Sequence, residues 1–375
     1  MKIVVAGDFV PANRLKSLVL EGKFDTVLGD IKNIISSADF SIVNFESPIV
    51  KDGYKPIKKN GPNLCCTEKA LEAIKWAGFK CITLANNHVF DYGANGLNET
   101  IKCCKNKGIG FVGVGDNLKD ASKILYKEID GDTLAVINCC EHEFSIATDT
   151  IPGANSLNAI QQFYAIKEAH QHADFVLVIV HGGHEHYQLP SPRMQETYRF
   201  FIDAGADAII NHHQHCYSGY ELYNEKPIFY GLGNLLFDHV KKRNSIWNEG
   251  FMVSLHLKKG NNVEFELFPY TQCNDIPSIR LMGNNDSFSF KKKIEELNSI
   301  IIDESLLKKE HEKWMSLKQQ NIRFMFEPYY SRVMKRLYCW GFLPSLVTKK
   351  RKLQLINYLS CESHIDLVRY ILKKQ

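Results

Sequence analysis

The chain has 375 residues, 45% of them hydrophobic and 23% charged, which is typical of a globular protein and excludes a disordered, collagen-like or coiled-coil chain. Its formal net charge of +4 is too small to indicate nucleic acid as a partner. The charge is uneven, because residues 332–375 hold ten Lys or Arg and two acidic residues, a local charge of +8.

Short apolar runs alternate with helical patterns along the first 275 residues. We expect strands at residues 3–6, 40–43, 80–84, 110–114, 134–139, 175–180, 208–210 and 228–230, and helices at 24–36, 67–76, 93–105, 156–170 and 195–204. Residues 252–257 and 263–268 alternate apolar and polar side chains, which is typical of a hairpin at a sheet edge. The pattern predicts an α/β layered domain over residues 1–275, with functional loops at the carboxyl ends of strands.

From residue 276 onward the sequence becomes rich in Lys and Glu with helical spacing, which predicts a helical, basic C-terminal extension over residues 276–375. Within it, Lys349-Lys-Arg-Lys352 precedes apolar positions compatible with two short amphipathic helices. Such a segment could lie on an anionic membrane surface or dock on an acidic partner. The alternative is a helical appendage that packs on the α/β domain and leaves a solvated basic rim.

The cysteines and the first residues bear on the compartment. Six of the eleven cysteines form adjacent pairs and none lies in a C-x-x-C pair, so we expect buried free thiols in a reducing compartment. The apolar run over residues 1–7 is too short for a signal peptide, and no stretch reaches eighteen apolar residues. We therefore expect a cytoplasmic protein, which the basic end would allow to lie peripherally at the inner membrane.

Six of the fourteen histidines lie between residues 181 and 215. His181 directly follows one expected strand, and the group His212-His-Gln-His215 follows the next. Asp8, Glu46 and the group Asn86-Asn-His88 follow three earlier strands in the same way. Imidazoles that converge with carboxylates are the usual ligands of Zn, Mn or Fe. The sequence therefore predicts a site for one or two divalent ions where these strands end.

This constellation resembles the CapA branch, the poly-γ-glutamate capsule synthesis proteins, of the calcineurin-like metallophosphoesterase superfamily. The resemblance covers roughly residues 1–270 and is carried by Gly7-Asp8, Asn44-Phe-Glu-Ser-Pro48, Leu84-Ala-Asn-Asn-His-Val-Phe-Asp-Tyr-Gly93, His181-Gly-Gly-His-Glu-His-Tyr187, Gly205-Ala-Asp-Ala-Ile-Ile-Asn-His-His-Gln-His215 and Tyr230-Gly-Leu-Gly-Asn-Leu-Leu-Phe-Asp238. It implies a layered β-sandwich flanked by helices. It also implies two metal ions, bridged by a carboxylate, with hydroxide as the nucleophile.

The resemblance assigns ligands residue by residue. It makes Glu46 the bridging carboxylate. The remaining metal ligands would be Asp8 and His215 for one ion, and Asn87, His181 and His213 for the other. The superfamily's first motif is Asp-x-His, but this chain has Val10 in place of that histidine. One ion therefore lacks a ligand, so the site could hold two ions with an unusual ligand set or a single ion.

Three further residues are expected to act on the substrate. His88 resembles the histidine that protonates the leaving oxygen or stabilises the developing charge, and Asp91 could orient its imidazole. Glu185 matches a carboxylate typical of the branch, for which both an outer-shell or substrate role and a plain surface position are open. Lys58 and Lys59 could meet an anionic substrate or belong to a solvated loop. His184, His186 and His212 are interpreted as loop residues outside the ligand set, and Asn234 as a turn residue.

Two functions are therefore expected from the sequence. The first is a metal-dependent hydrolase of a phosphoester or of a γ-glutamyl or other amide bond, associated with capsule, poly-γ-glutamate or polysaccharide biosynthesis. Its partners would be an anionic small-molecule or polymer substrate and capsule biosynthesis proteins. The alternative is a non-catalytic capsule or envelope assembly factor that retains the metallophosphoesterase fold, and Val10 in place of histidine favours it.

Overall fold

The computed structural model describes the backbone of residues 1–329 and 331–373, and the side chains of these residues except 320–323, 362, 370 and 373. The chain divides into two compact units, Met1–Lys308 and Lys309–Gln375. The boundary expected at residue 275 lies within the first unit, because helix α8 (Asn284–Ile302) packs on strands β11 and β15 of that unit. The two units are described separately below.

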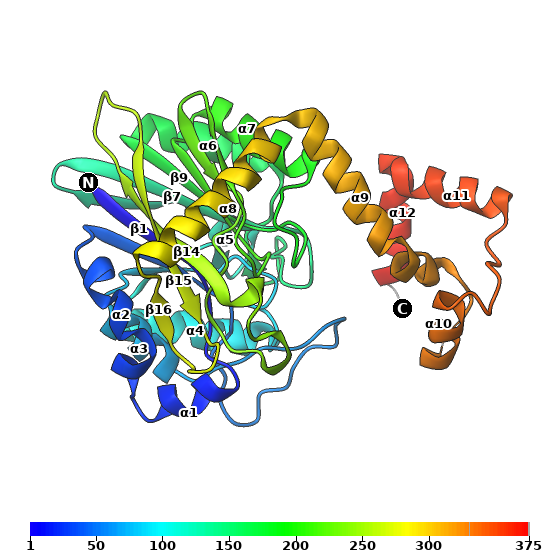
Figure 1. Cartoon of the computed structure of the whole chain (residues 1–375), viewed down its shortest axis with the longest axis horizontal. Helices are drawn as coiled ribbons and strands as arrows, with labels where there is room; N and C mark the ends of the chain where they lie inside the picture. Colours follow the sequence, from blue (N-terminus) through cyan, green and yellow to red (C-terminus); the bar gives the residue numbers. More distant parts are fainter. Residues whose placement is uncertain (330, 374–375) are drawn as a thin grey trace. The chain divides into compact units, whose positions relative to one another are not determined.

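The first unit contains two large mixed sheets (Figure 1). The eight-stranded sheet has the order β16-β15-β14-β1-β2-β3-β4, with β13 also paired to β1. Its strands are β1 (Lys2–Val10), β2 (Phe40–Phe45), β3 (Cys81–Thr83), β4 (Gly110–Val112), β13 (Asn234–Phe237), β14 (Glu249–His256), β15 (Glu264–Gln272) and β16 (Ile279–Leu281). Strands β1 to β4 and β13 run parallel, and β14 to β16 are antiparallel.

The six-stranded sheet has the order β11-β12-β10-β9-β7-β6. Its strands are β6 (Leu125–Ile129), β7 (Asp132–Cys140), β9 (Phe175–His181), β10 (Ala208–His212), β11 (Tyr220–Tyr223) and β12 (Lys226–Phe229). Strands β7, β9, β10 and β12 are parallel. A short pair, β5 (Val114–Gly115) and β8 (Gly153–Ala154), lies apart from both sheets.

Alternation along β1 shows how the layers form. Val4 and Ala6 contact the helices that cover the outer face of the eight-stranded sheet, whereas Ile3 and Val5 pack toward the other sheet. Successive side chains of a strand point to opposite faces, so β1 is buried on both sides. The helices are α1 (Arg14–Leu20), α2 (Phe24–Ser36), α3 (Lys69–Ala77), α4 (Gly93–Lys107), α5 (Leu118–Ala121), α6 (Ala159–His172) and α7 (Pro192–Ala204), with short 3-10 turns η1 (Val240–Lys242) and η2 (Ile246–Asn248).

The layered β-sandwich flanked by helices is thus confirmed, and local differences have local causes. The strand expected at residues 110–114 is divided into β4 and β5, because Gly113 adopts φ 95°. The expected hairpin forms as β14 and β15, but β16 pairs outside it, so the hairpin is not the sheet edge. The eleven cysteines have free thiols, and eight of them are buried.

The second unit is helical, as expected for the C-terminal extension. Helix α9 (Glu304–Arg323) runs into it from the first unit, and η3 (Phe324–Phe326), α10 (Arg332–Cys339), α11 (Lys349–Ser360) and α12 (Glu362–Lys373) follow. Buried Glu327 joins its parts by accepting hydrogen bonds from the hydroxyls of Tyr338 and Ser345 and from the amide of Leu346. Over the described residues, no helix is long and apolar enough to cross a bilayer.

Candidate metal centre

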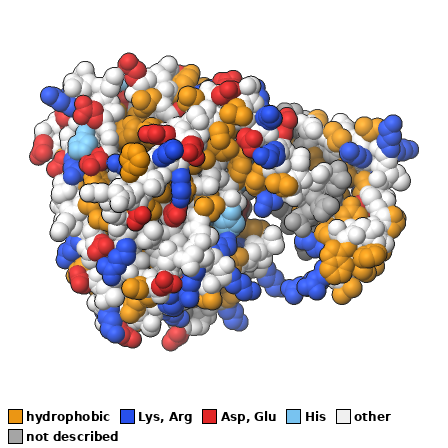
Figure 2. Space-filling view, in the orientation of Figure 1, with side chains coloured by type: hydrophobic (Ala, Val, Ile, Leu, Met, Phe, Trp, Pro, Cys, Tyr) orange, Lys and Arg blue, Asp and Glu red, His pale blue; other side chains and the backbone are white. Residues whose placement is uncertain are grey.

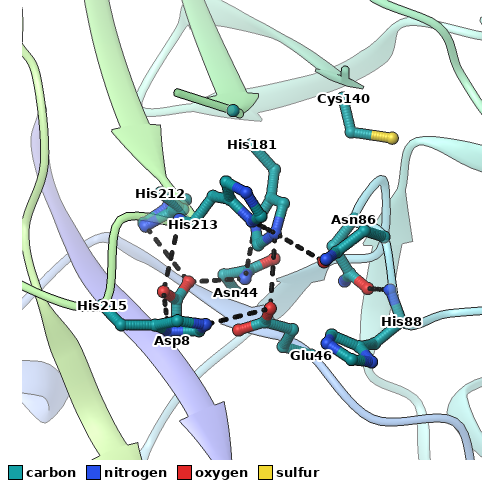
Figure 3. Close-up of polar contacts among 12 residues, drawn as sticks. Asp8, Asn44, Glu46, Asn86, His88, Cys140, His181, His212, His213 and His215 are labelled. Carbon is teal, nitrogen blue, oxygen red and sulfur yellow. Dashed lines mark hydrogen bonds and ion pairs between the residues drawn. The ribbon is translucent and has the colours of Figure 1, made fainter. Parts of the chain in front are cut away.

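The histidines and carboxylates singled out in the sequence lie together where strands of both sheets end. Asp8 is near the end of β1, and Glu46 follows β2 directly. His181 is the last residue of β9, and His213 and His215 follow β10. Figure 3 shows these five side chains pointing toward one another. The parallel strands of the two sheets therefore release their loops at one common edge.

Local backbone geometry turns Asp8 into this edge. A Cβ atom at Gly7 would lie 1.9 Å from the carbonyl oxygen of Gly233, so glycine alone permits this close approach of the chain before β13. The pairing register of β1 shifts on either side of Asp8, as at a β-bulge. His213 and His215 have positive φ angles of 93° and 54°. Such strained conformations are concentrated at functional sites.

Two clusters of ligand atoms share Glu46. One consists of Asp8, Glu46 and His215, and the other of Glu46, His181 and His213; within each cluster the ligand atoms lie within 4.8 Å of one another. His181 Nε2 is 3.4 Å from Glu46 Oε1, and His215 Nε2 is 3.8 Å from the same oxygen. The structure therefore brings together the carboxylate expected to bridge and the residues expected on either side of it.

Asn87 completes one side of this arrangement. Its Oδ1 atom lies 3.0 Å from His181 Nε2, and its Nδ2 donates to Glu143 Oε2 at 3.4 Å. This orientation directs the amide oxygen, the atom that can bind a cation, toward the cluster of His181 and His213. Glu143 was not anticipated from the sequence, and its Oε1 lies 3.8 Å from His213 Nε2.

The electrostatics of the buried cluster fit a cation. Burial and the neighbouring negative charge of Asp8 raise the pKa of Glu46 well above its usual value. Burial by itself would raise the pKa of Asp8. The hydrogen bond with His215 and the nearby histidines lower it by more than burial raises it, so the pKa of this carboxyl lies below its usual value. Burial, followed by the neighbouring His213, lowers the pKa of His181. The site thus combines neutral imidazole with carboxylate, as divalent metals require.

Glu46 gives the most direct test of this fit. Both of its carboxylate oxygens are buried and, among the described residues, neither has a hydrogen-bond partner. An unsatisfied buried carboxylate is costly unless it is neutralised or coordinates a metal. The residues present therefore fit one or two divalent cations held between Glu46 and the surrounding imidazoles, which makes this a candidate divalent metal site.

Two asparagines hold the candidate ligands from outside. Asn44 Nδ2 donates to Asp8 Oδ1 at 2.7 Å and lies 3.2 Å from His181 Nδ1. Asn234, interpreted from the sequence as a turn residue, is instead the first residue of β13, and its Oδ1 accepts from His215 Nδ1 at 2.9 Å. This contact directs the other ring nitrogen of His215 toward Glu46. For Asn44, the available signal was its place two residues before Glu46, because side chains two positions apart in an extended chain point to the same side.

His88 and Asp91 lie beside the clusters and contact each other. His88 Nδ1 is 2.7 Å from Asp91 Oδ2, and the amide of Leu64 donates to the same oxygen at 2.6 Å. The Lys59 ammonium contacts the other oxygen of Asp91, and the Lys59 side chain is only 2% exposed. Asp91 thus contacts the imidazole, and Lys59 belongs to this buried group and not to a solvated loop.

The remaining residues of interest divide between the rim and the interior. Glu185 is half exposed, and its carboxylate lies 3.8 Å from His186 Nε2. His186 Nε2 also contacts Lys242 Nζ, which lies 4.2 Å from the centre of the Trp247 ring. His212, interpreted as pointing away, is instead buried with its Nδ1 3.8 Å from Asp8 Oδ1.

The position at which the resemblance leads one to expect the histidine of an Asp-x-His motif is apolar in this chain. Val10 is buried and packs with Phe237 and Trp247. The Trp247 ring lies 4.9 Å from the ring of His215. The cluster of Asp8 and His215 therefore borders an apolar wall at Val10.

The fold and the site define an α/β sandwich protein with a candidate divalent metal centre, and comparison with known proteins gives its family. The model of the bacterial capsule synthesis protein PGA_cap matches residues 2–239. The chain is 32% identical over 277 residues to the capsule biosynthesis protein CapA of Bacillus anthracis, covering 72% of this chain and 67% of that protein. It is 31% identical over 268 residues to the PGA biosynthesis protein CapA of Bacillus subtilis (strain 168), covering 70% and 69%.

The chain therefore belongs to the bacterial capsule synthesis family PGA_cap, as its motifs predicted. Solved structures that it resembles include a novel phosphatase of Mycoplasma pneumoniae, with a TM-score of 0.45 and 15% identity over 73% of this chain and 95% of that one. Another is a hypothetical protein of Thermus thermophilus, with a TM-score of 0.46 and 14% identity over 72% and 99%.

Proposed function

We propose that this chain is a metal-dependent hydrolase that cleaves a phosphoester, or a γ-glutamyl or other amide bond, during synthesis of a capsule polymer such as poly-γ-glutamate or a polysaccharide. The proposal depends chiefly on one observation: Glu46 is shared by two clusters of candidate ligands, and both of its buried oxygens lack a hydrogen-bond partner among the described residues. A packed core has no need for such an arrangement.

In this proposal Asp8 and His215 would hold one ion, Asn87, His181 and His213 would hold the other, and Glu46 would serve both. Divalent ions in such a site supply Lewis acidity and lower the pKa of water toward neutrality. Asn44 and Asn234 keep the ligands oriented from outside, which preserves their positions during turnover.

In this proposal His88 transfers the proton that hydrolysis requires. Because its Nδ1 faces Asp91, the ring carries a proton at Nδ1, and Nε2 remains for exchange with the substrate. Figure 3 shows the His88 ring pointing toward Glu46. In a hydrolysis, the imidazolium form of His88 would give the proton on Nε2 to the departing oxygen or nitrogen, which would leave the neutral ring protonated at Nδ1, and a proton from water would restore the imidazolium.

The rim of the site favours an anionic substrate, either a small molecule or a polymer. Lys242 places a positive charge against His186 and Trp247, close to the ring of His215. Glu185 lies near the same rim and is the candidate for contact with an amine or hydroxyl of the substrate. The eight buried free thiols favour action in the cytoplasm, beside the proteins that make the polymer.

A second function is favoured by one specific observation. Val10, Phe237 and Trp247 form an apolar wall where a further metal ligand would be expected from the superfamily. A site that holds its ion incompletely would suit a non-catalytic capsule or envelope assembly factor that retains the fold.

One experiment distinguishes the two functions. The protein, purified without chelators, is analysed for Mn, Fe and Zn and then screened against phosphomonoesters, phosphodiesters and γ-glutamyl peptides, with Asp8→Ala as the blank. Bound metal together with turnover that Asp8→Ala abolishes supports the hydrolase. Bound metal without turnover on any substrate class favours the assembly factor. Metal at trace level only, even after reloading, contradicts the hydrolase.

A further inference from the structure

The second unit exposes many large apolar side chains. Trp340 and Phe342, in the turn after α10, are 68% and 73% exposed. Other apolar side chains of the unit are likewise exposed: Met325, Phe326, Val333, Met334, Leu346, Leu353, Ile356, Tyr358, Leu359, Leu367, Ile371 and Leu372. Figure 2 shows a continuous hydrophobic area over α10, with Lys and Arg at its margin. Exposed apolar surface on this scale marks a site of association.

The same unit carries four basic residues at the start of helix α11, where positive charge does not stabilise a helix. Lys349, Lys350, Arg351 and Lys352 occupy the first turn of α11. The helix dipole disfavours positive charge at that end, so these residues reduce the stability of α11. Within the described part of the chain none of the four forms an ion pair. Unpaired cations at an unfavourable position favour an external anionic partner.

The charge of the second unit and its exposed aromatic side chains indicate which kind of partner it binds. A second copy of the chain would bring one +8 segment against another, which opposes self-association through this surface. Exposed Trp and Phe side chains interleaved with Lys and Arg, on short amphipathic helices that cannot span a bilayer, are typical of a protein that lies in a lipid interface.

We propose that this unit docks on a membrane surface rich in anionic lipid. Trp340 and Phe342 enter the boundary between headgroups and acyl chains. Lys349, Lys350 and Arg351 lie at the lipid phosphates. This interaction is independent of the metal centre, and it would concentrate the chain at the membrane whether or not that centre is catalytic.

The test uses the full chain and sedimentation with vesicles. Vesicles of phosphatidylglycerol mixed with phosphatidylcholine are compared with vesicles of phosphatidylcholine alone, at low and high salt. We expect association with the mixed vesicles at low salt, and release near 1 M salt, where the screening length falls to about 3 Å. Each basic residue near an anionic surface contributes about fivefold in partitioning, so Lys349→Glu, Lys350→Glu and Arg351→Glu together should weaken association by at least about 100-fold.

Matched changes in the first unit control for charge and hydrophobicity. Lys258, Lys291 and Lys292 are exposed, and their joint replacement by Glu changes net charge equally. Phe288 on α8 is 74% exposed, so Phe288→Ser is the control for Trp340→Ser with Phe342→Ser. We expect both control variants to keep wild-type association and the paired serine variant to lose most of it. Circular dichroism verifies that each variant is folded.

Independent readouts keep the proposal open to refutation. The fluorescence of Trp340, measured as the difference between wild type and Trp340→Phe, should shift to the blue on addition of the mixed vesicles. Wild-type protein that stays in the supernatant at low salt overturns the proposal. Equal association with phosphatidylcholine alone also overturns it. A dimer in sedimentation equilibrium that Trp340→Ser dissociates, without vesicle association, would identify a second copy as the partner instead.

Discussion

The Nδ1 atom of His88 lies 2.7 Å from Oδ2 of Asp91, three residues further along the loop that follows β3. The same carboxylate contacts the buried ammonium of Lys59 and the amide of Leu64. These contacts keep the carboxylate of Asp91 in one position against the imidazole. The contact with Asp91 involves Nδ1 of His88, so Nε2 is the atom left for the proton transfer proposed above.

Replacing His88 should impair turnover without removing metal. We expect His88→Ala to lower kcat/KM by about 10²–10⁴, the usual effect of losing a positioned acid or base. Metal content, measured by mass spectrometry of the purified variant, should stay at the wild-type level because His88 is outside both ligand clusters. Loss of metal in His88→Ala would make this residue a ligand and contradict the assigned role.

Lys59 should act on turnover through Asp91. Lys59→Ala leaves the buried Asp91 carboxylate without its cation, and we expect kcat to fall by about 10–100-fold while KM changes little. Lys59→Arg, which keeps the charge, should recover part of the activity, and Lys58→Ala, at the exposed neighbouring position, should behave as wild type. Equal effects of Lys58→Ala and Lys59→Ala would instead indicate that the loop acts through its overall charge.

The shared position of Glu46 predicts a pattern of metal stoichiometry. Because His215 belongs to one cluster and His213 to the other, His215→Ala and His213→Ala should each lower the metal content by one ion per chain. Glu46→Gln should lower the occupancy of both sites. The measurement is elemental analysis of each variant after equilibration with a single metal. With two ions in the wild type, each of these two histidine variants should keep one ion per chain; one ion in the wild type and none in either variant would contradict two separate sites.

Asn234 should affect metal affinity through His215. Its Oδ1 accepts from His215 Nδ1, and loss of such a contact commonly weakens metal binding by about 10–100-fold. Asn234→Ala is therefore expected to raise the dissociation constant of the ion assigned to Asp8 and His215, measured by titration calorimetry. Asn98→Ala, on the exposed face of α4, serves as the control and should leave the constant unchanged.

A buried ion pair outside the candidate ligand set predicts a pH dependence of stability. Asp238 is fully buried and accepts hydrogen bonds from the backbone amide, Nε and Nη2 of Arg14. Burial by itself would raise the pKa of Asp238. The hydrogen bonds from Arg14 lower it by more than that, so the net shift is downward. The carboxylate therefore contributes stability above its unfolded pKa near 4, and this contribution is lost as the pH falls through the folded pKa.

Arg14→Ala tests this pair. Leaving the buried Asp238 carboxylate unpaired should cost about 3 kcal/mol at neutral pH, and the cost should shrink as protonation of Asp238 neutralises it toward pH 4. Thermal unfolding of wild type and variant between pH 7.5 and pH 4 measures the difference. Arg280→Ala breaks an exposed pair with Asp30 and should change stability little at any pH. A melting difference that is independent of pH would contradict the account.

The convergence of the candidate ligands is easier to predict from the sequence than the contacts around them, for a physical reason. Asp8, Glu46, His181 and the His213–His215 pair each follow an apolar run, and carboxyl ends of parallel strands meet at one edge. Their convergence thus needs only the strand order. The contact between Asn234 and His215, by contrast, depends on how β13 pairs with β1.

Contacts made by loops are less predictable still. Lys59 meets Asp91 from a loop 32 residues earlier in the chain, and no periodic pattern marks which of two adjacent lysines turns inward. The pair of Arg14 and Asp238 spans 224 residues. The extent of the first unit was missed in the same way, since α8 is rich in charge and only its contacts with β11 and β15 show that it belongs there.

The candidate ligands come from separate stretches of chain between residues 8 and 215 and from both sheets. No fragment that forms only one sheet can therefore bring these ligands together, and a metal held by them would require the finished sandwich. An ion that binds only the folded chain raises the free energy of unfolding, by about 2.7 kcal/mol at a free concentration of 100 times its dissociation constant. The supply of metal in the cell would thereby affect the rate at which the protein is degraded. Depletion of the metal would lower the abundance of the protein along with any activity.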